Sequence, residues 1–253
     1  HDYGLNPYLL ILDFSSNGKF LICDTETKKL RFDFDQVLVA LGRSPNTTGF
    51  GLEDLEVKLS ERGTINVNEF MQTNYPNIYA CGDVAGPFQF THTAAHQAWY
   101  AALNALFRPF KKFEVDYRVI PWCTFVEPEV ARVGVSETEA LEQKLEFDIT
   151  KYEISDLDRA ITESEDRGFV KVITQKGTDK ILGVTIVGDH AGDIISEYVT
   201  AMKYKMGLKK ILSTIHIYPT LAEANKYAAG VWQQNHKPQF ILKFLKRFHA
   251  WRR

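Results

Sequence analysis

Cysteine is scarce in this chain of 253 residues, and its three copies lie far apart. Cys23, Cys81 and Cys123 form neither a C-x-x-C nor a C-x-x-x-x-C pair, so the sequence carries no redox-active cysteine pair and no zinc-binding spacing. A disulfide framework is excluded for the same reason, which favours a reducing compartment. We therefore expect a cytoplasmic protein without a metal site.

Long apolar runs and glycine-rich loops are absent as well. No stretch reaches the ~18 apolar residues that cross a bilayer, and no signal peptide is recognisable, so we expect a protein that does not span a membrane. No G-x-G-x-x-G occurs, although that loop is what holds the pyrophosphate of a dinucleotide. The chain by itself should therefore lack a complete dinucleotide site.

What the sequence does have is a globular composition with an uneven charge. Hydrophobic residues make up 45% and charged residues 25%, which suits packed cores in one large or two small domains. The formal net charge of −2 offers no basic footprint for nucleic acid. Seven basic residues and no acidic residue follow Glu223, which leaves residues 1–223 with a net charge of −9. The pattern indicates an acidic body with a basic tail.

The first 43 residues predict short strands and then a buried one. The apolar or alternating segments that predict strands are residues 8–14, 19–25 and 29–34. Asn17-Gly18 between the first two is a hairpin signal. The continuous apolar run over 36–42 predicts a strand buried on both faces, as in a parallel sheet. Gly42 and Arg43 then begin a loop at the end of that strand, where ligands of open α/β sheets gather.

A glycine and an aspartate follow the next apolar segment. Residues 64–68 predict a short strand, and residues 78–81 predict a buried strand that ends in Gly82-Asp83. Because Gly82 has no Cβ, a ligand can approach the backbone closely. The Asp83 carboxylate could then accept hydrogen bonds from ligand hydroxyls. The alternative is that Asp83 only caps a turn.

The remaining pattern predicts a helix and then an α+β domain. Residues 91–107 predict a helix with Thr91 as N-cap, whose first N–H groups and dipole favour negative charge. Further on, a strand bracketed by Pro121 and Pro128 precedes a helix that Ser136 opens with a capping-box pattern. Two strands and a helix follow, over residues 168–175, 180–188 and 191–207. This order favours an antiparallel sheet.

Four segments in order resemble the C-terminal part of the flavin disulfide reductases, or pyridine nucleotide–disulfide oxidoreductases. They are FDQVLVALGRSPNT (34–47), TNYPNIYACGDVAG (73–86), WCTFVEPEVARVGVSETEA (122–140) and IHIYPTLAEANKYAAG (215–230). The resemblance implies an α/β portion followed by an α+β dimerisation domain. The implied domains are the end of an NAD(P)H-binding domain (1–44), the second segment of an FAD-binding domain (45–112), the dimerisation domain (113–235) and a basic amphipathic tail (236–253).

The resemblance also implies cofactors and a partner. It implies FAD, NADPH or NADH, a homodimer, and electron flow from NAD(P)H through FAD to a redox disulfide and an unidentified small-molecule or disulfide substrate. In that family the glycine-rich loops and the cysteine pair precede the matched segments. We therefore expect this chain to supply the flavin-ring end of the FAD site and the dimer interface, and to be inactive alone. The alternative is a non-enzymatic dimerisation or scaffold module derived from that family.

The flavin-site residues carry over one by one. Asp83, next to Gly82, matches the family aspartate that holds the ribityl chain of FAD. The start of the following helix implies that the backbone near the flavin pyrimidine ring belongs to Phe90, Thr91 and His92. Gly42 and Arg43 of the first matched segment are assigned to the cofactor site as well.

The fourth segment departs from the family at one catalytic position. Most members read His-Pro-Thr-x-x-Glu there, with the histidine as acid/base on thiols and the glutamate orienting it. Glu223 matches the glutamate, whereas Tyr218 occupies the histidine position and His216 lies two residues earlier. Mercuric reductases also have tyrosine there, which suggests that branch, although no cysteine pair lies near this C-terminus. A phenol with a pKa of about 10 shuttles protons poorly at neutral pH but can donate a hydrogen bond. The alternative is an interface aromatic.

Two further patterns leave alternatives open. His92 and His96 lie four residues apart, as metal ligands or simply as helix-packing residues. The tail spaces Phe244, Leu245, Phe248 and Trp251 at helical intervals among lysines and arginines. Such a basic amphipathic helix can bind the surface of an anionic membrane. It can equally pack on its own subunit or on a partner, with a solvated basic face.

Overall fold

The computed structural model describes residues 5–15, 18–25, 28–38, 40 and 42–252. The chain divides into two compact units, His1–Ser44 and Pro45–Arg253. The domain boundaries expected from the sequence stay a prediction.

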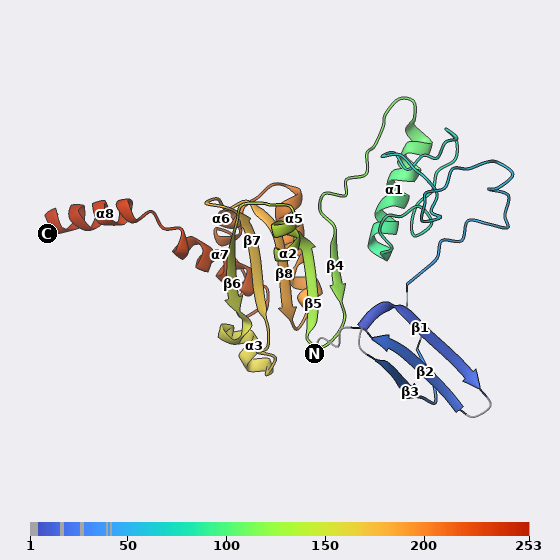
Figure 1. The fold of residues 1–253 in the computed structure, drawn as a ribbon. Coiled ribbons are helices and arrows are strands. Elements are labelled where there is room, and N and C mark those ends of the chain that lie inside the picture. Colours follow the sequence, from blue (N-terminus) through green and yellow to red (C-terminus); the bar gives the residue numbers. More distant parts are fainter. Residues whose placement is uncertain (1–4, 16–17, 26–27, 39, 41, 253) are drawn as a thin grey trace. The chain divides into compact units, whose positions relative to one another are not determined.

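The first unit is a three-stranded antiparallel sheet in the order β1-β2-β3 (Figure 1). The strands are β1 (Leu5–Ser15), β2 (Gly18–Thr25) and β3 (Lys29–Asp33). Ile22 of β2 lies opposite Ile11 on one side and Arg31 on the other. The three predicted strands are confirmed. Asn17 of the hairpin signal lies outside the described residues.

The predicted strand over residues 36–42 was wrong for its described residues. Gln36, Val37, Leu38, Ala40 and Gly42 form no strand, and the Leu38 side chain is 91% exposed. A strand buried on both faces needs hydrogen-bonded neighbours on both sides. In the described part of the first unit, the three antiparallel strands pair only among themselves, so this apolar run has no such neighbours.

Residues 45–90 of the second unit fold as connected turns against one helix. The strands predicted over 64–68 and 78–81 were wrong, because each shrinks to a single bridge, Leu59↔Ile65 and Gln72↔Tyr79. Isolated backbone hydrogen bonds take the place of a continuous strand ladder. One example is the hydrogen bond that Ala80 N donates to Met71 O at 3.1 Å. Helix α1 (Thr91–Phe107) covers this region and was predicted with its bounds.

The rest of the second unit is built on a five-stranded antiparallel sheet in the order β4-β5-β8-β7-β6 (Figure 1). Its strands are β4 (Pro121–Thr124), β5 (Glu129–Gly134), β6 (Phe147–Glu153), β7 (Phe169–Gln175) and β8 (Ile181–Gly188). A Cβ at Gly183 would lie 1.9 Å from the Val135 carbonyl oxygen, so this close crossing requires glycine. The predicted fold class, an α/β portion followed by an α+β domain with an antiparallel sheet, is confirmed.

Helices pack on this sheet around one core. They are α2 (Glu137–Glu142), η1 (Ile154–Asp156), α3 (Asp158–Glu163), α4 (Ala191–Ile194), α5 (Ser196–Lys203), α6 (Leu208–Leu212) and α7 (Glu223–Asn235), and α8 (Gln239–Trp251) follows α7 in the tail. Val172 of β7, Tyr198 of α5 and Trp232 of α7 share the buried core cluster. Full burial of a side chain such as Val172 contributes about 1.5–3 kcal/mol. The sheet is therefore the stable frame on which the neighbouring loops are held.

One helix start agrees with its prediction and one helix end does not. The capping box at Ser136 is confirmed, because its Oγ accepts from Glu139 N at 3.1 Å and Glu139 Oε2 accepts from Ser136 N at 2.8 Å. The single helix predicted over 191–207 was wrong, since it is two helices and ends at Lys203. The φ of +57° at Lys205 cannot continue a helix, and Met206 N closes the end on Ala201 O.

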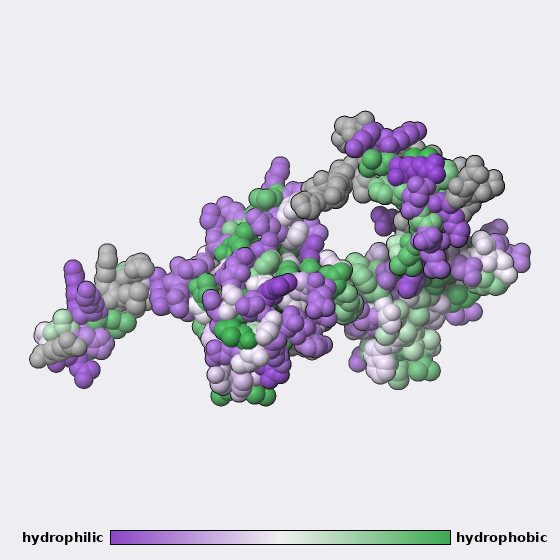
Figure 2. Space-filling model, turned by 90° about the horizontal axis from the view of Figure 1, so that it is seen from below, coloured by the Kyte–Doolittle hydropathy of each residue, from purple (hydrophilic) through white to green (hydrophobic). Residues whose placement is uncertain are grey.

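The C-terminal tail is helical, as its spacing predicted. Hydrophobic and hydrophilic residues lie side by side on α8 (Figure 2). None of the helices among the described residues has the length and apolar character to cross a membrane.

Candidate functional site

The turn after residue 81 is shaped by a glycine in a left-handed conformation. Gly82 has a φ of +78°, and a Cβ added there would meet Ala94 Cβ of α1 at 3.4 Å. Its carbonyl accepts from Ala85 N at 2.9 Å and from Gly86 N at 3.1 Å. Asp83 lies in this turn and is partly buried. The turn therefore holds a carboxylate beside a backbone that passes close to α1.

A buried glutamine fixes that turn to the helix. Gln97 is fully buried, and its Oε1 accepts from Gly82 N at 2.6 Å. Its Nε2 donates to Gly86 O at 3.0 Å and to Tyr117 Oη at 2.8 Å. Sequence reasoning missed Gln97. The available signal was a polar residue on the buried stripe of α1 formed by Thr93, Gln97, Ala101 and Asn104.

The N-terminus of α1 has no side-chain cap. Thr91 as N-cap was wrong, because Thr91 is the first helical residue and extended Phe90 is the N-cap. The first turn contains no acidic residue, and no side chain hydrogen-bonds the cap. A helix start of this kind leaves N–H groups and a positive dipole end for an electronegative ligand atom. Thr91 and His92 are exposed there.

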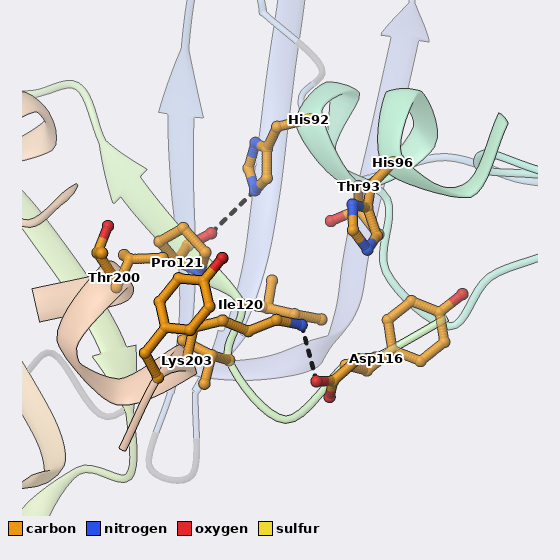
Figure 3. A pocket seen from close by; sticks show the side chains of 12 residues that line it. His92, Thr93, His96, Asp116, Ile120, Pro121, Thr200 and Lys203 are labelled. Carbon is orange, nitrogen blue, oxygen red and sulfur yellow. Dashed lines mark hydrogen bonds and ion pairs between the residues drawn. The ribbon is translucent and has the colours of Figure 1, made fainter. Parts of the chain in front are cut away.

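Stacked aromatic rings join the start of α1 to β4. The Phe90 ring stacks on His92 at 5.2 Å and on Trp122 at 6.4 Å, each with an interplanar angle of 10°. His92 Nε2 donates to Pro121 O at 2.9 Å (Figure 3). The predicted residues Phe90, Thr91 and His92 thus lie together at one end of α1, within the same unit as Gly82 and Asp83.

A pocket of about 280 Å³ lies next to this helix start. His92, Thr93 and His96 of α1 line one side, and the Lys203–Asp116 ion pair at 2.7 Å lines another (Figure 3). Hydrogen bonds from Arg118 and then Lys203 hold the pKa of Asp116 well below its usual range. Burial, and then the charge of Lys203, lowers the pKa of His96. The pocket thus offers an imidazole that is predominantly neutral at neutral pH and a closed ion pair.

The second predicted site centres on an exposed phenol. Tyr218 is 64% exposed, and its Oη donates to Asp158 Oδ2 at 2.9 Å. The hydrogen bond to Asp158 and the charge of that carboxylate raise the pKa of Tyr218. The phenol therefore stays protonated at neutral pH and can act as a hydrogen-bond donor. Sequence reasoning missed Asp158, which lies in the first turn of α3.

Glu223 is held by its own loop and not by Tyr218. It is 3% exposed at the start of α7, and its Oε2 accepts from Thr220 N at 3.3 Å. Lys226 Nζ lies 3.8 Å from its Oε1. The two residues predicted to be catalytic are therefore neighbours in one segment, while the hydrogen bond of Tyr218 goes to a different element.

Two more tyrosines lie beside this loop. The rings of Tyr152 and Tyr227 stack with centroids 5.5 Å apart and an interplanar angle of 25°. Burial, reinforced by Asp156, raises the pKa of Tyr152 to about 12. The surroundings of Tyr218 are thus aromatic and acidic, and both Tyr152 and Tyr218 favour the protonated state.

Gly42 and Arg43 belong to the first unit, whereas residues 82–92 belong to the second. Gly42 has a φ of +100°, and both residues are exposed. Within the described part of the chain, no group of three or more His, Cys, Asp or Glu residues could hold a metal ion. His96 instead contacts Tyr100, with ring centroids 4.8 Å apart.

Comparisons with known proteins agree on one family. The pyridine nucleotide-disulphide oxidoreductase model matches residues 11–98, and that family's dimerisation-domain model matches residues 120–229. A dihydrolipoyl dehydrogenase of Chlamydia trachomatis is 41% identical over 76% of this chain and 40% of its own length. One from Staphylococcus aureus is 38% identical over 85% of this chain and 45% of its own length.

A solved structure has the same fold. It is the HOCl-induced flavoprotein disulfide reductase RclA from Escherichia coli, with a TM-score of 0.75 and 24% identity. The similarity covers 87% of this chain and 49% of that one. The chain thus spans less than half the length of each of these proteins.

Proposed function

The chain belongs to the pyridine nucleotide-disulphide oxidoreductase family, and on that premise we propose that it forms part of an FAD-dependent enzyme. The enzyme would pass electrons from NADH or NADPH through FAD to a redox disulfide and then to a substrate. Because the chain spans under half the length of the relatives described above, the activity is proposed for the whole protein. The chain's own share would be the flavin-ring end of the FAD site and the dimer interface.

The observation that carries this proposal is the braced turn beside an uncapped helix start. The Asp83 carboxylate would accept hydrogen bonds from ribityl hydroxyls, and the left-handed Gly82 lets the cofactor come close to the backbone. The N–H groups at Phe90, Thr91 and His92 would stabilise negative charge on the flavin pyrimidine ring. FAD, when bound, supplies the two-electron chemistry, and these residues bind and orient it.

Gly42 and Arg43 complete the proposed cofactor set. Their proposed place is the loop at the end of the nicotinamide-binding part, which is consistent with the family match over residues 11–98. Both residues are exposed and thus accessible to a ligand.

At the second site we assign Tyr218 the role of hydrogen-bond donor to substrate. Its raised pKa makes it a poor general base near neutral pH. Asp158 would position the phenol, and Glu223 would hold the loop through Thr220 N. Proton transfer to the thiols would then need a group other than Tyr218, because the carboxylates of Asp158 and Glu223 both raise the pKa of its phenol.

A homodimer is the proposed assembly. Ile215 is 97% exposed, Ile217 is 79% exposed, and both precede Tyr218 in the same loop. Two isoleucine side chains and the Tyr218 ring exposed together within four residues favour burial against another protein surface. The family's dimerisation model covers this segment, which supports a second copy of the chain as the partner.

Two observations bear on the substrate. The relatives named dihydrolipoyl dehydrogenase favour a small dithiol or disulfide. Tyrosine at position 218 favours the mercuric-reductase-like branch. We propose dithiol–disulfide exchange as the shared chemistry, in the cytoplasm, with peripheral membrane contact through the basic tail.

A flavin spectrum tests the proposal. The whole protein should purify yellow, with an oxidised flavin absorbance that bleaches when NADH or NADPH is added without oxygen. A colourless dimer would instead favour the scaffold alternative and end the enzymatic proposal.

A further inference from the structure

Helix α8 presents one aromatic stripe to solvent. Phe240, Phe244, Phe248 and Trp251 are spaced by four, four and three residues. At 3.6 residues per turn they fall within an arc of about 80°. Phe240 is 73% exposed and Trp251 is 81% exposed. So much aromatic surface in water on a single helix indicates a face that another phase or molecule covers.

Cations border this stripe. At about 100° per residue, Arg247 lies on one side of the arc and Arg252 on the other, with Lys246 further round. All three are exposed. Residues 236–253 contain six basic residues and no acidic one, so no side chain of the tail sequence neutralises them.

The described contacts of the stripe remain inside the helix. Phe248 contacts His249 and Trp251, with ring centroids 5.6 and 6.2 Å apart. Arg252 lies over the Phe248 ring at 5.9 Å. The dimerisation-domain match ends at residue 229, before α8 begins. The helix thus lies outside the range that the dimerisation-domain model matches.

We propose that α8 binds the headgroup layer of an anionic lipid bilayer. The aromatic rings would enter at the boundary with the acyl chains, and the flanking arginines and lysine would contact lipid phosphates. The inference deepens the proposed peripheral location and is independent of redox chemistry. The acidic body, with a net charge of −9 over residues 1–223, would be repelled from the same surface. Residues 236–238 separate α7 from α8 and allow the two to diverge.

Charge favours lipid over a second copy of the helix. Two α8 helices packed stripe to stripe would bring their arginines together, which is repulsive. An anionic bilayer supplies opposite charge along the whole helix and a layer that favours tryptophan and phenylalanine. Packing of α8 on the body of the partner subunit is the competing outcome, and the experiment distinguishes the two.

Co-sedimentation with vesicles tests the inference on the full chain. We expect binding to vesicles of equal phosphatidylcholine and phosphatidylglycerol, with far less binding to phosphatidylcholine alone. Replacing Lys246→Glu and Arg247→Glu together should weaken binding roughly tenfold or more. The matched control replaces exposed Lys58→Glu and Arg62→Glu, which changes net charge equally and should retain binding.

A second measurement follows the stripe itself. Trp251 emission, taken as the difference between the parent chain and Trp251→Phe, should shift to the blue with anionic vesicles. Failure of the chain to sediment with anionic vesicles would overturn the inference. Equal vesicle binding by the α8 double variant and by the Lys58→Glu/Arg62→Glu control would overturn it as well. A Trp251 shift that follows dimerisation without lipid would assign α8 to the partner subunit instead. Neither readout requires flavin or turnover, so each outcome is independent of the enzymatic proposal.

Discussion

The Tyr218 phenol donates a 2.9 Å hydrogen bond to the Asp158 carboxylate, which joins the loop before α7 to the first turn of α3. The bond has a chemical consequence, because an adjacent carboxylate disfavours the phenolate and raises the pKa of Tyr218. A group in this state donates a hydrogen bond at neutral pH. It does not take up and release protons there as a histidine would.

Removing the phenol hydroxyl should affect one half-reaction only. In the whole protein, Tyr218→Phe should slow disulfide reduction about five- to tenfold, the loss expected for one hydrogen bond of about 1 kcal/mol. Reduction of the flavin by NAD(P)H should be unchanged. Stopped-flow absorbance separates the two steps. Tyr204→Phe, on another exposed tyrosine at the end of α5, is the control and should alter neither. Unchanged turnover by Tyr218→Phe would remove the residue from the mechanism.

Neutralising the carboxylate should move the titration of the phenol downward. Asp158→Asn removes the charge that raises the pKa of Tyr218, so that pKa should fall toward about 10, the ordinary value for tyrosine. Ring-carbon NMR of tyrosine across alkaline pH reports each phenol. Asp156→Asn is the matched control. Asp156 raises the pKa of Tyr152, so its replacement should leave the pKa of Tyr218 unchanged. Equal shifts of Tyr218 in both variants would contradict the pairing.

Loss of the buried glutamine should loosen the turn at Gly82. Gln97→Leu removes the side-chain partner of Gly82 N and of Gly86 O, each at a cost of about 1–3 kcal/mol. Urea denaturation of the chain should show the loss, and the whole protein should retain less FAD. Gln234→Leu, an exposed position on α7, should change neither quantity. Wild-type stability in Gln97→Leu would show that the turn is held by other contacts.

A charge on the exposed apolar loop should separate the subunits. Ile217→Asp places a carboxylate where we expect an apolar contact with a second copy. The variant should be a monomer by light scattering at micromolar concentration, while the parent is a dimer. Leu141→Asp, equally apolar and 62% exposed on α2, should remain a dimer. A monomeric parent chain would count against the assembly.

Local signals in the sequence predicted local structure well. The Ser136 capping box and the bounds of α1 follow from residues within one or two turns of each other. Residues 36–42 failed because an apolar run becomes a buried strand only when neighbouring strands cover it. The prediction of Thr91 as N-cap failed by one residue, because the helix already begins at Thr91 and Phe90 is its N-cap.

Sequence alone proposes site residues only where a motif carries them. Gly82, Asp83 and Glu223 are proposed through segments that resemble a family, and their roles stay a prediction. Asp158 lies 60 residues before Tyr218, and no spacing rule joins a residue of α3 to the loop before α7. The bracing role of Gln97 depends likewise on three partners that come together only in the folded chain.

Flavin content of an Asp83 variant tests the central claim most directly. The whole protein and its Asp83→Ala variant should be purified in parallel, and bound FAD measured per polypeptide by absorbance after denaturation. Because a carboxylate hydrogen bond contributes about 1.5–3 kcal/mol, we expect FAD affinity to fall by tenfold or more. Asp54→Ala, on an exposed loop, should retain full FAD. A stoichiometric flavin content and unchanged affinity in Asp83→Ala would contradict the account.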